Sequence, residues 1–296
     1  MWYRGGVRLG VVFPQTDLQV DALSVRAYAL GVEALGYTHV VAFDHVLGAD
    51  PKVHQNWRGP YDVDNTFHEP LVLYGYLAAL TSLELVTGIL ILPQRQTALV
   101  AKQAAEVDLL SQGRLRLGIG LGWNPVEYEA LGRKFTDRGR RVEEQVTVLR
   151  SLWTERSISH KGPTETLAGV GIAPLPVQRP IPIWFGATSE VALRRAGRLG
   201  DGWFPHSPPG KGLEHLKDVV EASARQAGRD PKGLGMEGRA TVGESGVQGL
   251  VEQVGLWQEA GATHVSISTM GAGLHTAADH LEVLSNCADA LHLVRA

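Results

Sequence analysis

Residues 83–122 read LELVTGILILPQRQTALVAKQAAEVDLLSQGRLRLGIGLG, and this stretch decides the fold. It begins with an apolar run, 83–92, which stops at Pro93 and is typical of a buried β-strand. A helical pattern covers 98–110, and a second apolar run, 115–119, leads into a glycine-rich turn. Strands that alternate with helices in this way are usually parallel and covered by those helices, so the stretch indicates an α/β protein.

The same alternation continues through the whole chain. Strands are expected at 7–13, 39–43, 83–92, 115–119, 181–185, 202–204, 234–242 and 264–268. Helices are expected at 21–35, 70–80, 98–110, 138–153, 189–199, 213–227, 247–259 and 277–290. Eight such units suit a closed (β/α)8 TIM barrel, which takes about 250 residues plus insertions, and a doubly wound open sheet is the alternative. No low-complexity linker divides the chain, so we expect one domain over residues 1–296.

Two segments are too long to be ordinary connections. They cover residues 49–67 and 158–180, and both are rich in proline, glycine and polar residues. Loops of this length are uncommon unless they have a function. The active site of a TIM barrel lies at the C-terminal ends of its strands. We therefore expect both segments to be loop insertions over that face.

Composition and charge exclude several classes of protein. The chain has 296 residues, 44% of them hydrophobic, with 28 basic and 31 acidic side chains and a net charge of −3. This balance argues against a nucleic-acid or membrane-surface partner. The single cysteine, Cys287, excludes an intrachain disulfide, and no His, Asp, Glu or Cys residues have metal-ligand spacing, so no metal is expected. Without a signal-peptide pattern or an apolar stretch of ~20 residues, the expected location is the cytoplasm.

Asp44 and His45 follow the second expected strand and are the best acid–base candidates. A histidine at a buried strand end beside a carboxylate has its tautomer and pKa set locally, which suits proton transfer. The alternative interpretation is a helix-capping aspartate beside a hydrogen-bonded structural histidine.

Two turns offer close approach to a ligand. Residues 118–122 follow the fourth strand and lack bulky side chains, so a flat ring or a phosphate could lie against the backbone. They are not a dinucleotide fingerprint, because the third glycine of that motif would fall on Trp123. Residues 186–189 precede a helix whose free N–H groups could bind a phosphate. An ordinary tight turn and an ordinary capped helix are the alternatives.

Taken together, these motifs resemble the bacterial luciferase-like superfamily of monooxygenases and oxidoreductases, and within it the coenzyme F420-dependent oxidoreductases. The resemblance covers nearly the whole chain and rests on the order and spacing of several short stretches. They are VVAFDH at 40–45, VTGILILP at 86–93, AKQAAEVD at 101–108, SQGRL at 111–115, GIGLGWN at 118–124, EYEALG at 127–132, RGRR at 138–141, PIWFG at 182–186 and AGRLGDGW at 196–203.

The resemblance implies a TIM-like barrel that holds a flavin or deazaflavin at its mouth. The ring of the cofactor rests in this family against a bulge with a non-prolyl cis peptide, which here corresponds to Gly88 and Ile89. Asp44 and His45 correspond to the pair that faces the ring. The remaining matches are the wall beside the ring and ribityl chain (Gly120, Gly122, Trp123) and the phosphate-binding turn (Gly186, Ala187, Thr188). Glu190, next to that turn, is expected to point outward.

The same resemblance favours F420 over FMN. FMN-using luciferases place an arginine near the strand-four turn to hold the phosphate, whereas residues 120–122 here are Gly-Leu-Gly. The implied reaction is hydride transfer between C5 of the deazaflavin and a small organic substrate, with His45, assisted by Asp44, as proton donor or acceptor. The alternatives are an FMN-dependent monooxygenase that uses reduced flavin and O2, and a non-catalytic flavin-binding protein.

The substrate itself is not predicted by any motif. Aromatic residues in or near the least similar loops form the candidate substrate pocket: Trp57, Tyr61, Trp123, Trp203 and His206. Trp57 and Tyr61 have an alternative role as loop anchors or as part of a subunit contact. Members of the superfamily are commonly dimers, so the resemblance implies a homodimer.

Overall fold

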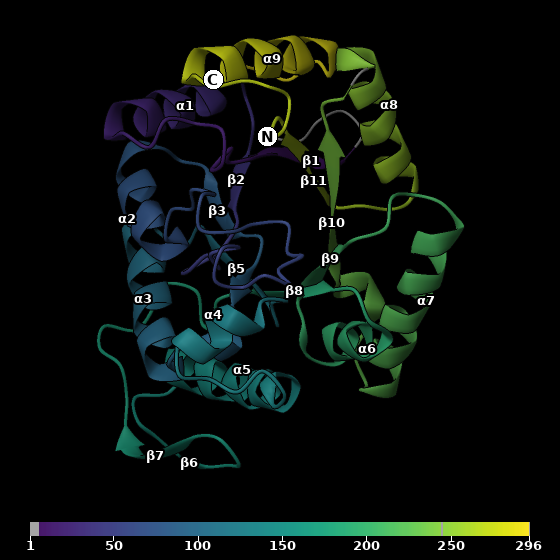
Figure 1. The fold of residues 1–296 in the computed structure, drawn as a ribbon. Coiled ribbons are helices and arrows are strands. Elements are labelled where there is room, and N and C mark those ends of the chain that lie inside the picture. The colour runs from purple at the N-terminus through teal and green to yellow at the C-terminus, as the bar shows by residue number, and fades with distance from the viewer. Residues whose placement is uncertain (1–5, 244, 296) are drawn as a thin grey trace.

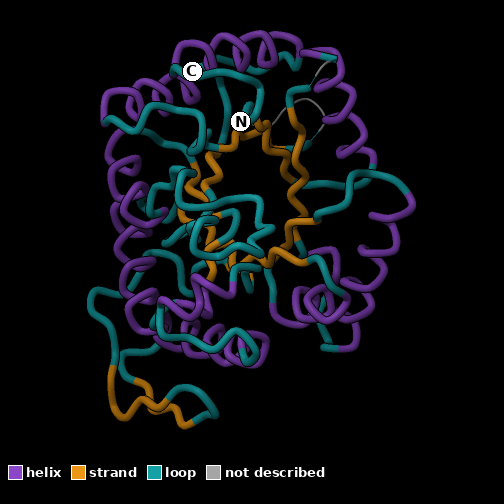
Figure 2. Tube along the Cα trace, viewed as in Figure 1, coloured by secondary structure: helices purple, strands orange, loops and turns teal. Residues whose placement is uncertain are grey.

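The computed structural model describes residues 6–243 and 245–295, which form a closed barrel inside a ring of helices (Figure 1, Figure 2). All neighbouring barrel strands are parallel, and the pairings β1–β11 and β3–β5 complete the closure. The strands are β1 (Arg8–Val12), β2 (His39–Ala42), β3 (Glu84–Thr87), β4 (Leu90–Ile91), β5 (Leu115–Gly120), β8 (Ile183–Ala187), β9 (Gly202–Pro205), β10 (Gly235–Thr241) and β11 (His264–Ser268). The predicted (β/α)8 barrel is therefore confirmed, and the open sheet is excluded.

The outer helices lie where apolar periodicity predicts them, within three residues at each end. They are α1 (Ala22–Ala34), α2 (Pro70–Leu80), α3 (Thr97–Leu110), α5 (Arg138–Thr154), α6 (Glu190–Leu199), α7 (Lys211–Gln226), α8 (Gly246–Glu259) and α9 (Ala277–Ala290). Polar caps define several starts: Asp21 accepts hydrogen bonds from the amides of Leu23 and Ser24, and Thr276 forms a capping box. No described helix is both long enough and apolar enough to cross a membrane.

The third predicted strand, 83–92, is interrupted in the structure. β3 and β4 are separated by Gly88 and Ile89, whose peptide bond is cis, as the resemblance implies. Val86 pairs with Arg116, and Leu90 pairs with Ile119. The chain therefore advances by four residues from β3 to β4 while the neighbouring strand β5 advances by three. One extra residue on one strand is a β-bulge. The chain then enters a short 3-10 helix, η1 (Leu92–Gln94), instead of continuing as a strand.

The segment 158–180 does not cover the active face, contrary to expectation. It contains an antiparallel hairpin, β6 (Ile158–Lys161) and β7 (Thr166–Val170), that projects from the side of the barrel (Figure 2). Glu144 of α5 binds the hairpin through His160, 2.9 Å away. The rest of the segment follows α3, where Gln178 donates to Asp108 at 2.7 Å. Polar partners on the outer helices therefore draw this segment away from the mouth.

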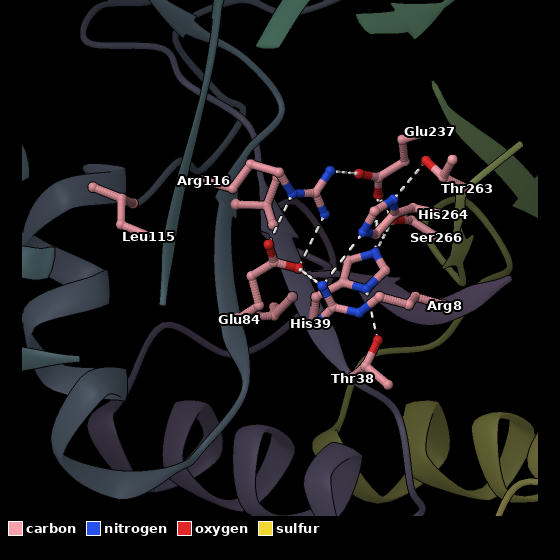
Figure 3. A network of polar contacts seen from close by, with 12 residues as sticks. Arg8, Thr38, His39, Glu84, Leu115, Arg116, Glu237, Thr263, His264 and Ser266 are labelled. Carbon is pink, nitrogen blue, oxygen red and sulfur yellow. Dashed lines mark hydrogen bonds and ion pairs between the residues drawn. The ribbon is translucent and has the colours of Figure 1, made fainter. Parts of the chain in front are cut away.

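A buried ionic network closes the N-terminal end of the barrel (Figure 3). Arg116 of β5 forms ion pairs with Glu84 of β3, at 3.1 Å, and with Glu237 of β10. His39 Nε2 lies 3.0 Å from Glu237 Oε1, and the Arg116 guanidinium stacks 4.2 Å from the centre of the Trp184 ring. We call these residues, together with Arg8 and His264, the barrel-floor network. It fills the barrel below the mouth, so a ligand has access only from the C-terminal ends of the strands.

Candidate active site

A cavity of about 550 Å3 lies at the C-terminal ends of the barrel strands. Its volume is within the range of small-molecule sites, roughly 300–1,000 Å3. It is lined by Phe43, Asp44, His45, Pro60, Tyr61, Gly88, Ile89, Ile91, Gly120, Leu121, Gly122, Trp123, Arg138, Gly186, Thr188, Ser189, Ala192, His206 and Arg239. Most of the predicted site residues therefore meet in one place.

The bulge forms one wall of this cavity, and Ile89 is its central side chain. A Cβ added to Gly120 would lie 2.5 Å from Ile89 Cδ1, and one added to Gly186 would lie 3.0 Å from Ile89 Cγ2. The two glycines on β5 and β8 therefore leave space for Ile89, which packs flat across both strands. Gly122 has a φ of +66°, a conformation that favours glycine. We call Gly88, Ile89, Gly120 and Gly186 the bulge wall.

His45 lies beside the bulge wall, and its partner is Glu127. The Nδ1 atom of His45 is 3.3 Å from Glu127 Oε2, and the Glu127 side chain is fully buried. The rings of Tyr61, Phe67 and Trp123 surround the imidazole at centroid distances of 5.4, 4.8 and 5.4 Å. This packing holds the ring of His45 in one orientation.

Glu127 lies on a short helix, α4 (Pro125–Ala130), which Asn124 caps by accepting hydrogen bonds from the amides of Val126 and Glu127. Its other carboxylate oxygen accepts hydrogen bonds from the amides of Val46 and Leu47, at 2.6 and 3.2 Å. Burial by itself would raise the pKa of Glu127, but the hydrogen bonds from His45 and these amides outweigh it and lower the pKa below its usual value. Glu127 is therefore ionised at neutral pH.

The expectation that Asp44 assists His45 is wrong. The carboxylate of Asp44 accepts hydrogen bonds from the amide of Ile91, at 2.8 Å, and from Arg95, at 2.7 Å. Arg95 in turn pairs with Glu69, at 2.7 Å. Asp44 thus connects the end of β2 to the residues that follow the bulge. Side chains of adjacent residues on an extended chain point in opposite directions, which explains why the two neighbours have different partners.

Arg138 supplies a positive charge at the cavity that the residues of the strand-four turn, 120–122, do not predict. It begins α5, lines the cavity, and places its guanidinium 3.6 Å from the centre of the Phe135 ring. Its Nη1 donates to the carbonyl of Phe135 at 2.6 Å, and its buried Nε has no hydrogen-bond partner in the described chain. The positive charge therefore comes from α5, the helix that follows the turn. The lack of an arginine at residues 120–122 is thus only weak evidence against an FMN phosphate.

Thr188 and Ser189, at the start of α6, line the same cavity. Ser189 caps this helix by accepting a hydrogen bond from the amide of Ala192. Glu190 points outward, as expected, and pairs with Arg194 on the surface. Ala187 is buried and does not line the cavity, so the phosphate-binding prediction concerns Gly186 and Thr188 at this turn.

The predicted substrate pocket is only partly assembled at the mouth. Tyr61 and His206 line the cavity, whereas the ring of Trp57 packs against Trp123 with a centroid distance of 5.4 Å, as a loop anchor does. Trp203 is buried on the outside of β9, beside Val220 of α7, and the prediction for it is wrong. The alternation of a strand explains this, because the next residue, Phe204, faces into the barrel and meets Trp184.

Three functional candidates were not predicted: Glu127, Arg138 and Arg239. For Glu127 and Arg239 the sequence contains a pattern that indicates their position. Asn124 followed by a proline indicates a capped helix, which brings Glu127 next to the strand-four turn. Glu237 and Arg239 are two residues apart in a buried strand of a closed barrel, so their side chains share one face of the strand. The other face is covered by the apolar faces of helices, so both charged side chains point into the interior of the barrel.

Sequence comparison establishes the family. The family model described as luciferase-like monooxygenase matches residues 7–267. An uncharacterized protein of Mycobacterium tuberculosis is 33% identical over 226 residues, 73% of this chain and 77% of that protein. An F420-dependent glucose-6-phosphate dehydrogenase of Segniliparus rotundus is 31% identical over 226 residues, 73% and 63% of the two chains. An FMNH(2)-dependent dimethylsulfone monooxygenase of Pseudomonas putida is 31% identical over 176 residues, 58% and 48% of the two chains.

Solved structures share the fold. The monooxygenase RslO1 of Streptomyces bottropensis has a TM-score of 0.78 at 17% identity and covers 96% of this chain and 98% of its own. The coenzyme F420-dependent tetrahydromethanopterin reductase of Methanopyrus kandleri has a TM-score of 0.75 at 14% identity, with 97% and 99% coverage. With the family model, these findings place the chain in the luciferase-like monooxygenase family. It is an enzyme of the oxidoreductase class.

Proposed function

We propose that the chain is an F420-dependent oxidoreductase that transfers a hydride between the deazaflavin and a small organic substrate. The observation that carries the proposal is His45, which is held by an ionised Glu127 next to the bulge wall. The relatives support a flavin or deazaflavin cofactor. The F420-dependent relative matches a larger share of this chain than the FMNH(2)-dependent one does, 73% against 58%, which supports F420.

The described residues fit such a cofactor. The bulge wall presents an apolar surface for a flat ring, and Arg138 has an unpaired buried Nε for an anionic group. Gly186, Thr188 and the start of α6 complete a site at which backbone N–H groups and the helix dipole favour a phosphate. When bound, a deazaflavin supplies a carbon that accepts or donates a hydride and reacts poorly with oxygen.

His45 moves the proton that accompanies the hydride. A carboxylate only accepts hydrogen bonds, so the nitrogen that faces Glu127, Nδ1, carries a hydrogen. In the neutral ring the other nitrogen, Nε2, is then the proton acceptor, and in the charged ring it is the donor. The hydrogen bond to Glu127 keeps this tautomer of the ring in place during turnover. His45 therefore accepts a proton from an alcohol-like substrate or donates one to a carbonyl-like substrate.

Titration with oxidised F420 and with FMN, followed by absorbance and fluorescence, tests the proposal. We expect micromolar binding of F420, and loss or recovery of its visible absorption band as a substrate reduces or reoxidises it. Arg138 favours a second candidate, an FMN-dependent monooxygenase, because it provides a cation for the FMN phosphate. Binding of FMN but not F420, with oxygen uptake by the complex with reduced FMN, would replace the first candidate with the second. The absence of binding by either cofactor would refute both.

A further inference from the structure

The wall of the cavity opposite the bulge carries a second cation, Arg239. Around the barrel the strand order is β1, β2, β3, β5, β8, β9, β10 and β11, so β10 stands directly across from β3. Arg239 lies on β10 and lines the cavity together with His206, which follows β9. Phe43, which follows β2, borders the bulge wall beside Gly88, and Tyr61 also lines the cavity. We call Arg239 and His206 the arginine wall. When a flat group lies against the bulge wall, the arginine wall faces the molecule that occupies the rest of the cavity.

The side chain of Arg239 is directed into the cavity by the alternation of β10. Glu237, two residues earlier, points into the barrel and belongs to the barrel-floor network. Between them, Gly238 faces outward, because a Cβ there would lie 2.2 Å from the Trp257 ring of α8. Arg239 therefore points inward, one layer closer to the mouth. It is exposed, and its guanidinium lies 5.8 Å from the centre of the Phe43 ring.

No acidic side chain of the described cavity lining forms an ion pair with Arg239. Among the described residues that line this cavity, Asp44 is the single acidic one, and it pairs with Arg95. Burial lowers the pKa of His206, and the nearby charge of Arg239 lowers it further. This ring is therefore neutral at pH 7. Arg138 is the other cation of the lining, and the proposed function assigns it to the cofactor.

We propose that Arg239 binds an oxyanion of the substrate, a carboxylate or a phosphoryl group, through a paired hydrogen bond. A guanidinium presents two parallel N–H donors that match such a group. The apolar part of the substrate then packs against Phe43 and Tyr61, and its reacting carbon lies between the arginine wall and the bulge wall, within reach of His45. The substrate class is a small organic anion. The inference rests on the proposed function in one respect, namely that F420 is the other occupant of the cavity.

Calorimetric titration with three probes of similar shape tests this inference: benzoate, phenyl phosphate and neutral benzamide. The wild-type protein is titrated without cofactor and again with saturating oxidised F420. We expect at least one anion to bind about tenfold more tightly than benzamide, as a charge-assisted hydrogen-bond pair requires. The ratio of benzoate to phenyl phosphate affinity distinguishes a carboxylate site from a phosphoryl site.

Two variants of Arg239 and one matched arginine control decide the assignment. With saturating F420 bound, Arg239→Gln is expected to abolish the preference for anions, Arg239→Lys to retain part of it, and Arg138→Gln to retain it. The affinity for F420 is expected to fall in Arg138→Gln and to stay unchanged in Arg239→Gln. Circular dichroism confirms that each variant is folded. The inference is overturned if the wild type shows no anion preference, if Arg239→Gln keeps it, or if Arg239→Gln weakens F420 binding as Arg138→Gln does. Failure of F420 to bind the wild type refutes the proposed function alone, because cofactor-free titrations of Arg138→Gln, with and without the Arg239→Gln change, still test Arg239.

Discussion

Glu127 holds both the imidazole of His45 and the main chain that follows it. One carboxylate oxygen lies 3.3 Å from Nδ1 of His45, and the other accepts hydrogen bonds from the amides of Val46 and Leu47. The carboxylate is fully buried, so each of these hydrogen bonds compensates for lost hydration. Glu127 is therefore a positioning residue in the proposed function, in which His45 is the residue that meets the substrate.

Replacing His45 by alanine should lower turnover by at least ~100-fold, the usual contribution of a general acid or base. Because the bulge wall, Arg138 and the start of α6 stay in place in this variant, the affinity for F420 should change much less. Turnover is measured as the change in the visible absorption of F420, and affinity by fluorescence titration. Equal turnover in the variant and the wild type would remove His45 from the mechanism.

Replacing Glu127 by glutamine should slow turnover by roughly 10- to 100-fold through the tautomer of His45. The amide nitrogen of glutamine donates a hydrogen bond to Nδ1, and the hydrogen of the imidazole then moves to Nε2. The pH–rate profile should change in Glu127→Gln, because the negative charge beside the ring is lost, and Glu127→Asp should restore part of the rate. A profile identical to that of the wild type would mean that Glu127 acts only as a structural residue.

At the level of elements, the bulge between β3 and β4 determines the shape of the bulge wall. The extra residue places Ile89 across β5 and β8, where Gly120 and Gly186 provide the necessary space. The function of these glycines is thus indirect. They allow Ile89 to lie flat, and Ile89 in turn presents an even surface to the cavity.

Gly186→Val should therefore reduce cofactor affinity by at least ~10-fold, equivalent to ~1.4 kcal/mol. The added carbons would contact Ile89, whose nearest atom is 3.0 Å from an ideal Cβ, and push it toward the cavity. Gly75→Ala is a suitable control, because a Cβ on this α2 residue would meet nothing within 4 Å. Fluorescence titration of F420 measures the effect. Wild-type affinity in a folded Gly186→Val protein would show that this wall does not contact the cofactor.

On the scale of the whole molecule, the barrel-floor network joins strands from all sides of the barrel (Figure 3). His264 of β11 faces Arg8 of β1, Trp184 of β8 and His39 of β2, and Arg116 stands close by. Burial is the main cause that lowers the pKa of His264, to about 2, and the charges of Arg116 and His39 add to it. Burial would raise the pKa of Glu237, but Arg116 and His39 lower it below its usual value.

Acid should destabilise the fold through this network. His264 is neutral in the folded protein, whereas in the unfolded chain it binds a proton below its ordinary pKa of ~6.5. The free energy of unfolding should therefore decrease as the pH falls from 7 to 5, by up to ~1 kcal/mol per pH unit, and Glu237 adds to the loss below pH ~4.5. Urea unfolding at several pH values measures the slope.

Substitution of single histidines separates this contribution from others. His264→Gln should flatten the slope between pH 7 and 5, since glutamine does not titrate. His275→Gln, at an exposed residue before α9, should leave the slope unchanged. The same slope in His264→Gln as in the wild type would assign the acid sensitivity to other groups. The expected homodimer and the cytoplasmic location stay predictions.

The sequence by itself determined the elements of the barrel and the place of its site. Apolar periodicity is a property of neighbouring residues, so α2, α9 and β11 could be predicted to the exact residue. Gly88, His45 and Gly186 could be assigned to one site because the ends of parallel strands converge in a closed barrel. The resemblance to a known family added the cis bond between Gly88 and Ile89, which periodicity does not show.

Only the tertiary structure decided which side chains meet. Glu127 reaches His45, and Arg138 reaches the cavity, because α4 and the start of α5 pack beside the mouth, and their contacts depend on barrel closure. Trp203 was misplaced because its side of β9 depends on the register of that strand, and a shift of one residue exchanges the two faces. The segment 158–180 moved away from the mouth because its polar partners, Glu144 and Asp108, lie on the outer helices. Contacts between residues far apart in the chain have no local pattern, so they follow only from the folded arrangement.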